Sequence, residues 1–179
     1  MRRLSLLALP LLLLPACQSA RVPGYERGWY AGGAFTAIPG VGLAAGGGKV
    51  IHGTERSDWS AEAQLIRHFL DDKDIADDER ADHGRLTAIR AGLKHTFSPG
   101  HKRHLVVRYG FQFNRATGVP GIVDLPGDYL GGYLGVGFET DLNRHWTMGP
   151  ELSFALLEGE GALPLEFVPT FFWHLIRNF

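Results

Sequence analysis

The C-terminal stretch from Leu163 to Phe179 constrains the fold most strongly, because large apolar residues recur there at every second position. One set of alternate positions holds Leu163, Leu165, Phe167, Pro169, Phe171, Trp173, Leu175, Arg177 and Phe179. The other set includes Glu166, Thr170, His174 and Asn178. A period of two, with one bulky apolar face and one partly polar face, predicts a β-strand whose apolar face lies against hydrocarbon. An aromatic ring at the end of such a strand suits a membrane interface.

The composition favours a single domain of short strands. About 160 residues follow the N-terminal apolar segment, which is the length of one domain. The net charge of −1 gives no indication of a nucleic-acid partner. No apolar run reaches the roughly 18 residues of a membrane-spanning helix, but the alternating strands of a transmembrane barrel escape that test. The 24 glycines and 11 phenylalanines suit strands and tight turns.

Eight segments show strand-like alternation. They are residues 28–37, 41–52, 58–70, 84–97, 104–115, 128–141, 145–157 and 163–177. The pattern is clearest in 104–115, where apolar residues occupy the odd positions, and weakest in 41–52, which contains Gly46-Gly47-Gly48. Pro150 and Pro169 lack an amide N–H, so each predicts a bulge or a locally weakened ladder.

The connections between these segments alternate in character. Short polar turns are expected at 53–57, 98–103 and 142–144, and longer loops at 71–83 and 116–127. An even number of strands, with both termini on the side of the short turns, is typical of bacterial single-chain barrels. The sequence therefore predicts that residues 28–179 form an all-β, eight-stranded antiparallel up-and-down transmembrane β-barrel. We expect both termini to face the periplasm.

This arrangement sorts the aromatic residues into two levels on the outward face. One predicted belt, at the periplasmic strand ends, holds Trp29, Trp59, Phe97, Phe138, Trp146 and Phe179. The other, near the outer ends, holds Phe35, Phe69, Phe113, Phe154 and Phe167. Two belts one strand length apart are expected where a barrel meets the two membrane interfaces. A soluble periplasmic β-barrel binding lipoprotein, the alternative fold, would bury its aromatic residues inward.

The N-terminus predicts export. A basic Met1-Arg2-Arg3 segment precedes an apolar stretch too short to span a bilayer, so residues 1–16 are interpreted as a signal peptide. Leu14-Pro15-Ala16-Cys17 resembles a bacterial lipoprotein signal, which implies a lipid on Cys17 and a lipidated linker over residues 17–27. Pro15 departs from that pattern, and ordinary cleavage near Ala16 or Ala20 is the alternative. Gln18 is what the resemblance associates with delivery to the outer membrane.

A family resemblance lies in the last 80 or so residues. Gly135-Val136-Gly137-Phe138-Glu139 and the stretch from Leu142 to Leu152 resemble the last turn of the small outer-membrane β-barrel domain family, which includes the OmpA-like, OmpX-like and opacity-type proteins. The resemblance implies the eight-stranded fold and the bacterial outer membrane, but no specific activity. The partners expected there are outer-membrane lipids, lipopolysaccharide and, through the C-terminal strand, the barrel-assembly machinery. We expect a monomer.

Several charged residues are expected to point into the barrel. They include Glu62, His68, Arg90, Lys94, Arg108, Glu151, Glu166 and His174. The turn lengths place Glu62 level with Gly92, so that Arg90 and Lys94 become its diagonal neighbours and expected partners.

The same register places Arg108 level with Gly135 and then Glu151, where the glycine leaves room for a contact. Glu62, Arg90, Lys94, Arg108 and Glu151 thus form a predicted charge cluster. We interpret it as a polar plug that fills an interior too narrow for a channel. A proton or ion path is the alternative.

A catalytic site would need a nucleophile, a base and an orienting group within hydrogen-bond reach. Ser153 and His174 point inward on adjacent strands, but the expected register places His174 level with Trp146, more than about 20 Å from Ser153. We therefore predict no catalytic residues, and we expect no cofactor and no metal site. The predicted role is structural or surface-interacting, with a non-conducting lumen. A lipid-modifying outer-membrane enzyme, of deacylase or acyltransferase type, is the alternative.

Overall fold

The structure, a computed structural model, describes residues 28–38, 40–54, 56–69, 85–99, 101–117, 126–160 and 165–179. All eight predicted segments form strands, and each predicted bound lies within two residues of the observed one. The strands are β1 (Trp29–Ile38), β2 (Val41–Gly53), β3 (Ser57–Phe69), β4 (Arg85–Phe97), β5 (Arg103–Thr117), β6 (Gly127–Asp141), β7 (Trp146–Gly159) and β8 (Leu165–Asn178).

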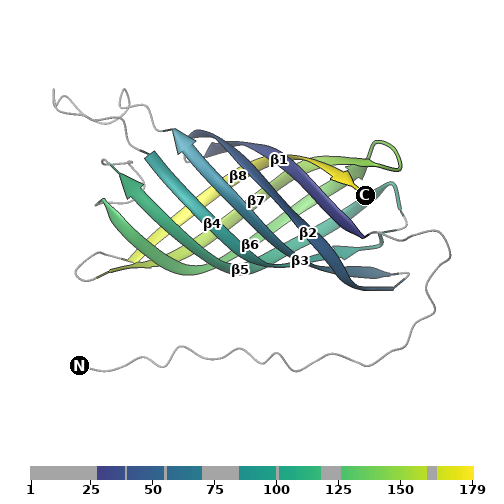
Figure 1. Cartoon of the computed structure of the whole chain (residues 1–179), viewed down its shortest axis with the longest axis horizontal. Coiled ribbons are helices and arrows are strands. Elements are labelled where there is room, and N and C mark those ends of the chain that lie inside the picture. The colour runs from purple at the N-terminus through teal and green to yellow at the C-terminus, as the bar shows by residue number, and fades with distance from the viewer. Residues whose placement is uncertain are drawn as a thin grey trace.

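The strands close into one antiparallel barrel (Figure 1). Each strand pairs with its neighbours in the sequence, and β1 also pairs with β8, which removes both sheet edges. β1 begins and β8 ends at the same end of the barrel, which we call the terminal end (Figure 1). The opposite end is called the distal end. The predicted eight-stranded up-and-down topology is therefore confirmed. No helix formed by the described residues is long and apolar enough to cross a membrane.

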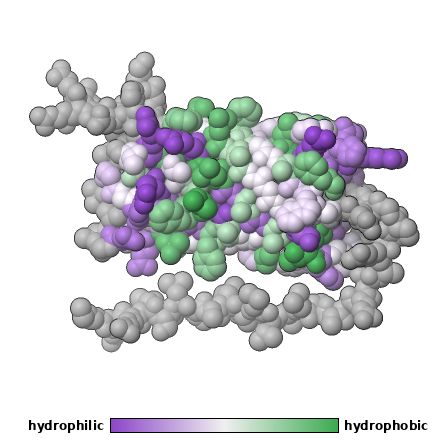
Figure 2. All heavy atoms as spheres, in the orientation of Figure 1, coloured by the Kyte–Doolittle hydropathy of each residue, from purple (hydrophilic) through white to green (hydrophobic). Residues whose placement is uncertain are grey.

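Apolar side chains cover much of the outer wall. In the view of Figure 2, hydrophilic side chains gather toward the two ends of the barrel and hydrophobic ones cover much of the wall between them. The residues assigned to the two aromatic belts lie at outward positions of their strands, apart from Phe179, which follows the end of β8. Trp29 and Phe35 are 62% and 68% exposed. A surface of exposed Phe, Leu and Trp is what a lipid-facing wall requires.

The two prolines behave differently. Beside Pro150, the pairing of β7 with β6 is interrupted over two residue pairs, so the weakened ladder predicted there is confirmed. At Pro169 the register between β7 and β8 continues without a shift, so no bulge forms there. The observed register shifts lie in β1 and β2, at sites without proline.

The lumen contains two kinds of filling. Near the distal end, inward side chains form two apolar clusters: Leu86, Ala116, Tyr129, Tyr133, Ala155, Leu157 and Val168 form one, and Ala34, Ile66, Ala88 and Phe172 form the other. Toward the terminal end, the buried inward side chains include the charged Glu62, Lys94, Arg108, Glu139 and Glu151. The interior is thus not filled by polar side chains alone, because the distal part holds these apolar clusters beside buried polar residues such as His68, Asn114 and Glu166.

Candidate functional site

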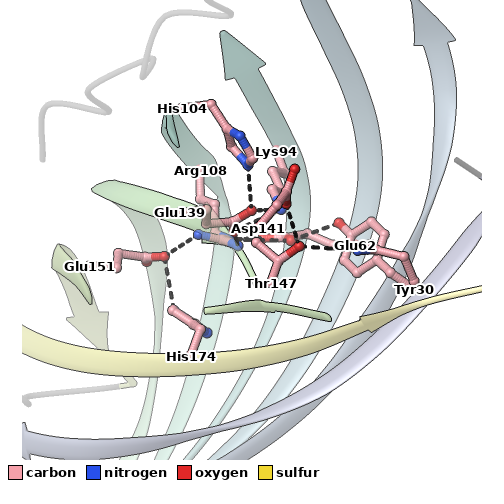
Figure 3. Close-up of polar contacts among 11 residues, drawn as sticks. Tyr30, Glu62, Lys94, His104, Arg108, Glu139, Asp141, Thr147, Glu151 and His174 are labelled. Atoms are coloured by element: carbon pink, nitrogen blue, oxygen red, sulfur yellow. Dashed lines mark hydrogen bonds and ion pairs between the residues drawn. The ribbon is translucent and has the colours of Figure 1, made fainter. Parts of the chain in front are cut away.

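The candidate site is a network of buried charges in the half of the lumen nearer the terminal end, and Arg108 of β5 lies at its centre (Figure 3). Arg108 is 2% exposed. Its Nη2 donates to Glu139 Oε1 at 2.7 Å, its Nη1 donates to Glu151 Oε2, and its Nε lies 3.1 Å from Glu62 Oε1. One guanidinium therefore joins carboxylates from β3, β6 and β7, which matches the planar fork of donors that arginine offers.

Glu139 of β6 connects a second cation to the network. Lys94 Nζ lies 2.8 Å from both carboxylate oxygens of Glu139. His104 Nε2 lies 3.5 Å from Glu139 Oε2. Because Lys94 and Arg108 are directly opposite each other in the β4–β5 ladder, the shared carboxylate offsets a repulsion between two like charges.

Two further side chains complete the network at its edges. The hydroxyl of Tyr30 on β1 donates to Glu62 Oε2 at 3.0 Å. His174 Nε2 on β8 lies 3.0 Å from Glu151 Oε2. The network thus includes residues from every strand except β2. Its ion pairs are buried from water, so each carboxylate depends on its partners to offset the cost of desolvation.

Glycines in the wall make room for these side chains. A Cβ at Gly48 of β2 would lie 2.5 Å from the hydroxyl oxygen of Tyr30. A Cβ at Gly135 would lie 3.0 Å from Cδ of Glu151. The last glycine of the Gly46-Gly47-Gly48 run therefore has a packing reason.

Glu62 has the predicted register but not the predicted partner. It lies opposite Gly92, as expected. The pairing expected with Arg90 or Lys94 is wrong, because the ion pair that Glu62 makes within the described residues is with Arg108.

Two glycines explain why Arg108 reaches Glu62. Gly92 and Gly110 are paired at inward positions of β4 and β5. Neither glycine has a side chain that could stand between Glu62 on β3 and Arg108 on β5. Arg108, two strands away, can therefore reach the Glu62 carboxylate more directly than the diagonal neighbours Arg90 and Lys94 can.

Arg90 lies outside the ion-pair network. Its guanidinium carbon is 4.7 Å from the ring centre of Tyr133 and 4.9 Å from that of Phe172, and its Nε donates to Gln112 Oε1. Within the described residues its two terminal nitrogens have no hydrogen-bond partner. Aromatic faces stabilise a desolvated guanidinium, so Arg90 bridges the charged and apolar parts of the lumen.

The contact between Arg108 and Glu151 crosses Gly135, as predicted, but the register of β7 differs from the expected one. Gly135 lies opposite Ser153, two residues from Glu151. The turn before β7 is longer than predicted, because Asn143 Oδ1 accepts hydrogen bonds from the backbone N–H groups of His145 and Trp146. With this Asx turn, five residues lie between the paired Asp141 and Thr147, two more than predicted.

The register of β8 also corrects an expectation about Ser153 and His174. His174 lies opposite Gly149, not Trp146, so about 13 Å of strand separates it from Ser153, which lies four positions further along β7. The β7–β8 pairing ends at Glu158 and Leu165 and is three positions out of the expected register throughout. The nitrogen of His174 that faces the network contacts Glu151, so no serine–histidine pair forms among the described residues.

Other predicted features lie elsewhere or outside the described residues. Cys17, the signal peptide and the linker fall outside them, as does the acidic stretch 71–83. No cluster of metal-ligating side chains occurs within the part of the chain that the structure describes. The outward position of the aromatic residues is observed, but their assignment to two membrane interfaces stays a prediction.

Sequence reasoning missed three members of the network: Tyr30, His104 and Glu139. All three lie at inward positions, and the alternation of their strands gives that position directly. Phe138 was placed outward, which puts Glu139 inward. The alternation of each strand therefore shows which residues face inward. The contacts themselves depend on how far each side chain extends across the lumen.

Comparison with protein-family models finds no match to the chain, and comparison with curated protein sequences finds none either. Solved structures do match. One is the attachment invasion locus protein Ail of Yersinia pestis, solved in complex with the heparin analogue sucrose octasulfate. It is 9% identical, with a TM-score of 0.53, and the match covers 84% of this chain and 96% of that one.

The N-terminal β-barrel domain of Pseudomonas aeruginosa OprF also matches. It is 15% identical, with a TM-score of 0.53, over 84% of this chain and 95% of that domain. Identities this low establish the fold and nothing finer. The chain therefore has the eight-stranded barrel fold that is also found in Ail and in the OprF barrel domain.

Proposed function

We propose that this protein is a small bacterial outer-membrane β-barrel with a structural or surface-interaction role, a non-conducting lumen and no enzymatic activity. Both termini face the periplasm, and Cys17 carries a lipid. The apolar outer wall and the fold shared with Ail and the OprF domain support the location. Loss of an acyl chain from lipid A incubated with the protein would contradict the non-enzymatic role.

The observation that carries the proposal is the filling of the lumen. Arg108 links carboxylates from three strands at the level where the interior is charged, and apolar clusters occupy the part nearer the distal end. An eight-stranded barrel encloses only enough space for its own side chains. An ion crossing this lumen would have to displace both layers.

Conductance across planar lipid bilayers tests the closed lumen. The purified protein should insert without producing stable current steps, whereas a general diffusion porin reconstituted in parallel should give them. Insertion is checked separately by flotation of the protein with lipid vesicles. Sustained ohmic steps at neutral pH would contradict the proposal.

The mass of the mature protein tests the anchor. A lipidated Cys17 should add the mass of a diacylglycerol and an N-acyl chain. An unmodified N-terminus near Gln18 or Arg21 would show that Pro15 prevents lipidation. The barrel assignment does not depend on that outcome, because it rests on the strands.

A further inference from the structure

Three arginines form a patch on the outer wall near the distal end. Arg67 of β3, Arg85 of β4 and Arg115 of β5 are exposed and lie at outward positions of three adjacent strands. We call these three residues the arginine patch. Charged residues on the lipid-facing side of a barrel are costly at the midplane and tolerated near the interfaces, which places this patch at a polar headgroup level.

The strand register brings the three side chains within reach of one ligand. Arg67 and Arg115 both lie level with Thr87, on either side of it. Arg85 follows two residues nearer the strand end on the intervening strand. With strands about 4.8 Å apart, the backbones of Arg67 and Arg115 are separated by about 10 Å, a distance that two arginine side chains easily span.

Among the described residues, the patch has more positive charge than its neighbours neutralise. Arg115 forms two hydrogen bonds of 2.8 Å with Asp128 of β6, and its side chain is 64% exposed. Arg67 lies 5.8 Å from the ring centre of Phe69. Neither Arg67 nor Arg85 has an ion pair with another described residue. Among the described residues, two guanidinium groups thus have no carboxylate partner, and Arg115 is held in place beside them by Asp128.

Apolar residues lie directly below the patch, toward the middle of the wall. Leu65, Ile89 and Phe113 form the adjacent row across the same three strands, and Leu65 and Ile89 are 52% and 54% exposed. The surface therefore changes from cationic to apolar within two residues along each strand. A ligand with phosphates at one end and acyl chains at the other has the complementary arrangement.

The rest of the distal rim lacks this arrangement. The corresponding outward positions carry Asp128 on β6, Glu158 on β7, Leu165 on β8 and Val41 on β2. Among the described residues of this rim, the outward positive charge is thus confined to the face formed by β3, β4 and β5. Positive charge spread around the whole rim would suffice for a general attraction to an anionic surface. A single bound lipid instead needs the positive charges to lie together on one face.

We propose that the arginine patch is a binding site for lipopolysaccharide, with the phosphates of lipid A on Arg67, Arg85 and Arg115 and its acyl chains on Leu65, Ile89 and Phe113. Guanidinium groups bind phosphate oxygens through paired hydrogen bonds. This inference rests on the proposed function, because lipopolysaccharide occupies the outer leaflet and the patch meets it only if the termini are periplasmic.

Two triple variants test the site. The patch variant carries Arg67→Gln, Arg85→Gln and Arg115→Gln. The control variant removes the same charge from outward, exposed cations near the terminal end, through Lys49→Gln, Arg103→Gln and Arg177→Gln. Heat-modifiable migration in electrophoresis verifies that each variant is folded.

Native mass spectrometry of the full-length protein in detergent then measures the affinity for bisphosphorylated lipid A, monophosphorylated lipid A and phosphatidylglycerol. EDTA is present throughout, so that divalent cations cannot bridge phosphates to the carboxylates of residues 71–83. The wild type and the control variant should prefer bisphosphorylated lipid A. The patch variant should bind it about tenfold more weakly or worse, a loss of at least one charge-assisted contact.

Three outcomes would overturn the inference. Unchanged affinity of a folded patch variant for lipid A would show that the arginine patch is not the binding site. The proposal of a closed barrel would be unaffected. Equal affinity of the wild type for phosphatidylglycerol would mean that the patch attracts any anionic lipid. A loss of lipid A binding confined to the control variant would place the lipid A site at the terminal end, away from the arginine patch.

Discussion

Glu139 is the residue on which the lumen network depends most, because it separates two cations that face each other. Lys94 and Arg108 lie directly opposite across β4 and β5, and both contact the Glu139 carboxylate. All three side chains are at most 5% exposed. Water therefore screens the repulsion between the cations poorly, and the carboxylate has to offset it.

Replacing Glu139 with alanine should destabilise the barrel by about 3–5 kcal/mol, because one partner of a buried ion pair is removed and two like charges remain. Urea unfolding of protein refolded into lipid vesicles measures the change. Asp128→Ala, which breaks an exposed pair with Arg115, is the matched control and should leave stability nearly unchanged. Equal stability of both variants would show that Glu139 does not hold the network together.

Inward residues were predictable from the sequence, whereas their partners were not. Alternation gives the side of the wall, and Glu62, Lys94, Arg108 and Glu151 are all buried as expected. The partner of Glu62 depended on two glycines that let Arg108 cross the space between strands. The distance between two side chains in the lumen depends on where glycines leave room. That depends on several strands at once.

At the scale of elements, strand positions were predicted well because each strand repeats a signal over ten or more residues. Turns carry a weaker signal. The turn from β6 to β7 was predicted at three residues, whereas five lie between the paired Asp141 and Thr147. The bonding of Asn143 to two backbone N–H groups is a local feature that alternation does not reveal. The error shifted the predicted partner of Gly135 without changing which residues face inward.

The glycines of β6 provide a test of close strand packing. A Cβ at the inward Gly131 would lie 2.8 Å from the backbone carbonyl carbon of Leu156, which cannot move without distorting β7. The outward Gly132 meets only the carbonyl oxygen of Gly110, at 3.7 Å. We expect Gly131→Ala to cost about 1–3 kcal/mol, as overpacking does.

Gly132→Ala, one residue away, should keep or slightly raise stability, because alanine restricts the unfolded chain more than glycine does. Urea unfolding in vesicles compares the two variants under one condition. A Gly131→Ala variant as stable as Gly132→Ala would mean that β6 and β7 are further apart than the structure places them.

For the whole molecule, the exposed apolar residues of the outer wall indicate that the barrel is surrounded by lipid. Phe111 and Leu134 lie at outward positions in the middle of β5 and β6 and are 75% and 51% exposed. Arginine at either position should cost about 2–4 kcal/mol if the wall there lies at the bilayer midplane. The measurement is the free energy of unfolding from phospholipid bilayers.

Phe111→Leu and Leu134→Ile serve as controls, since both keep the site apolar. Arginine variants with wild-type stability in bilayers would contradict a lipid-facing wall at these positions. The same variants in detergent should be affected less, because a micelle adapts to a charge more easily than a bilayer does.

The pairing of β1 with β8 makes closure the last possible step of assembly. Tyr30 pairs with Asn178, so the first strand keeps one edge open until the final strand is in place, whatever the order in which the others join. Contacts between residues so distant in the sequence form slowly. An open edge can meanwhile recruit strands from other chains. The interval between the arrival of β1 and the docking of β8 is therefore when the chain is most prone to aggregate, and it ends only when the barrel is complete.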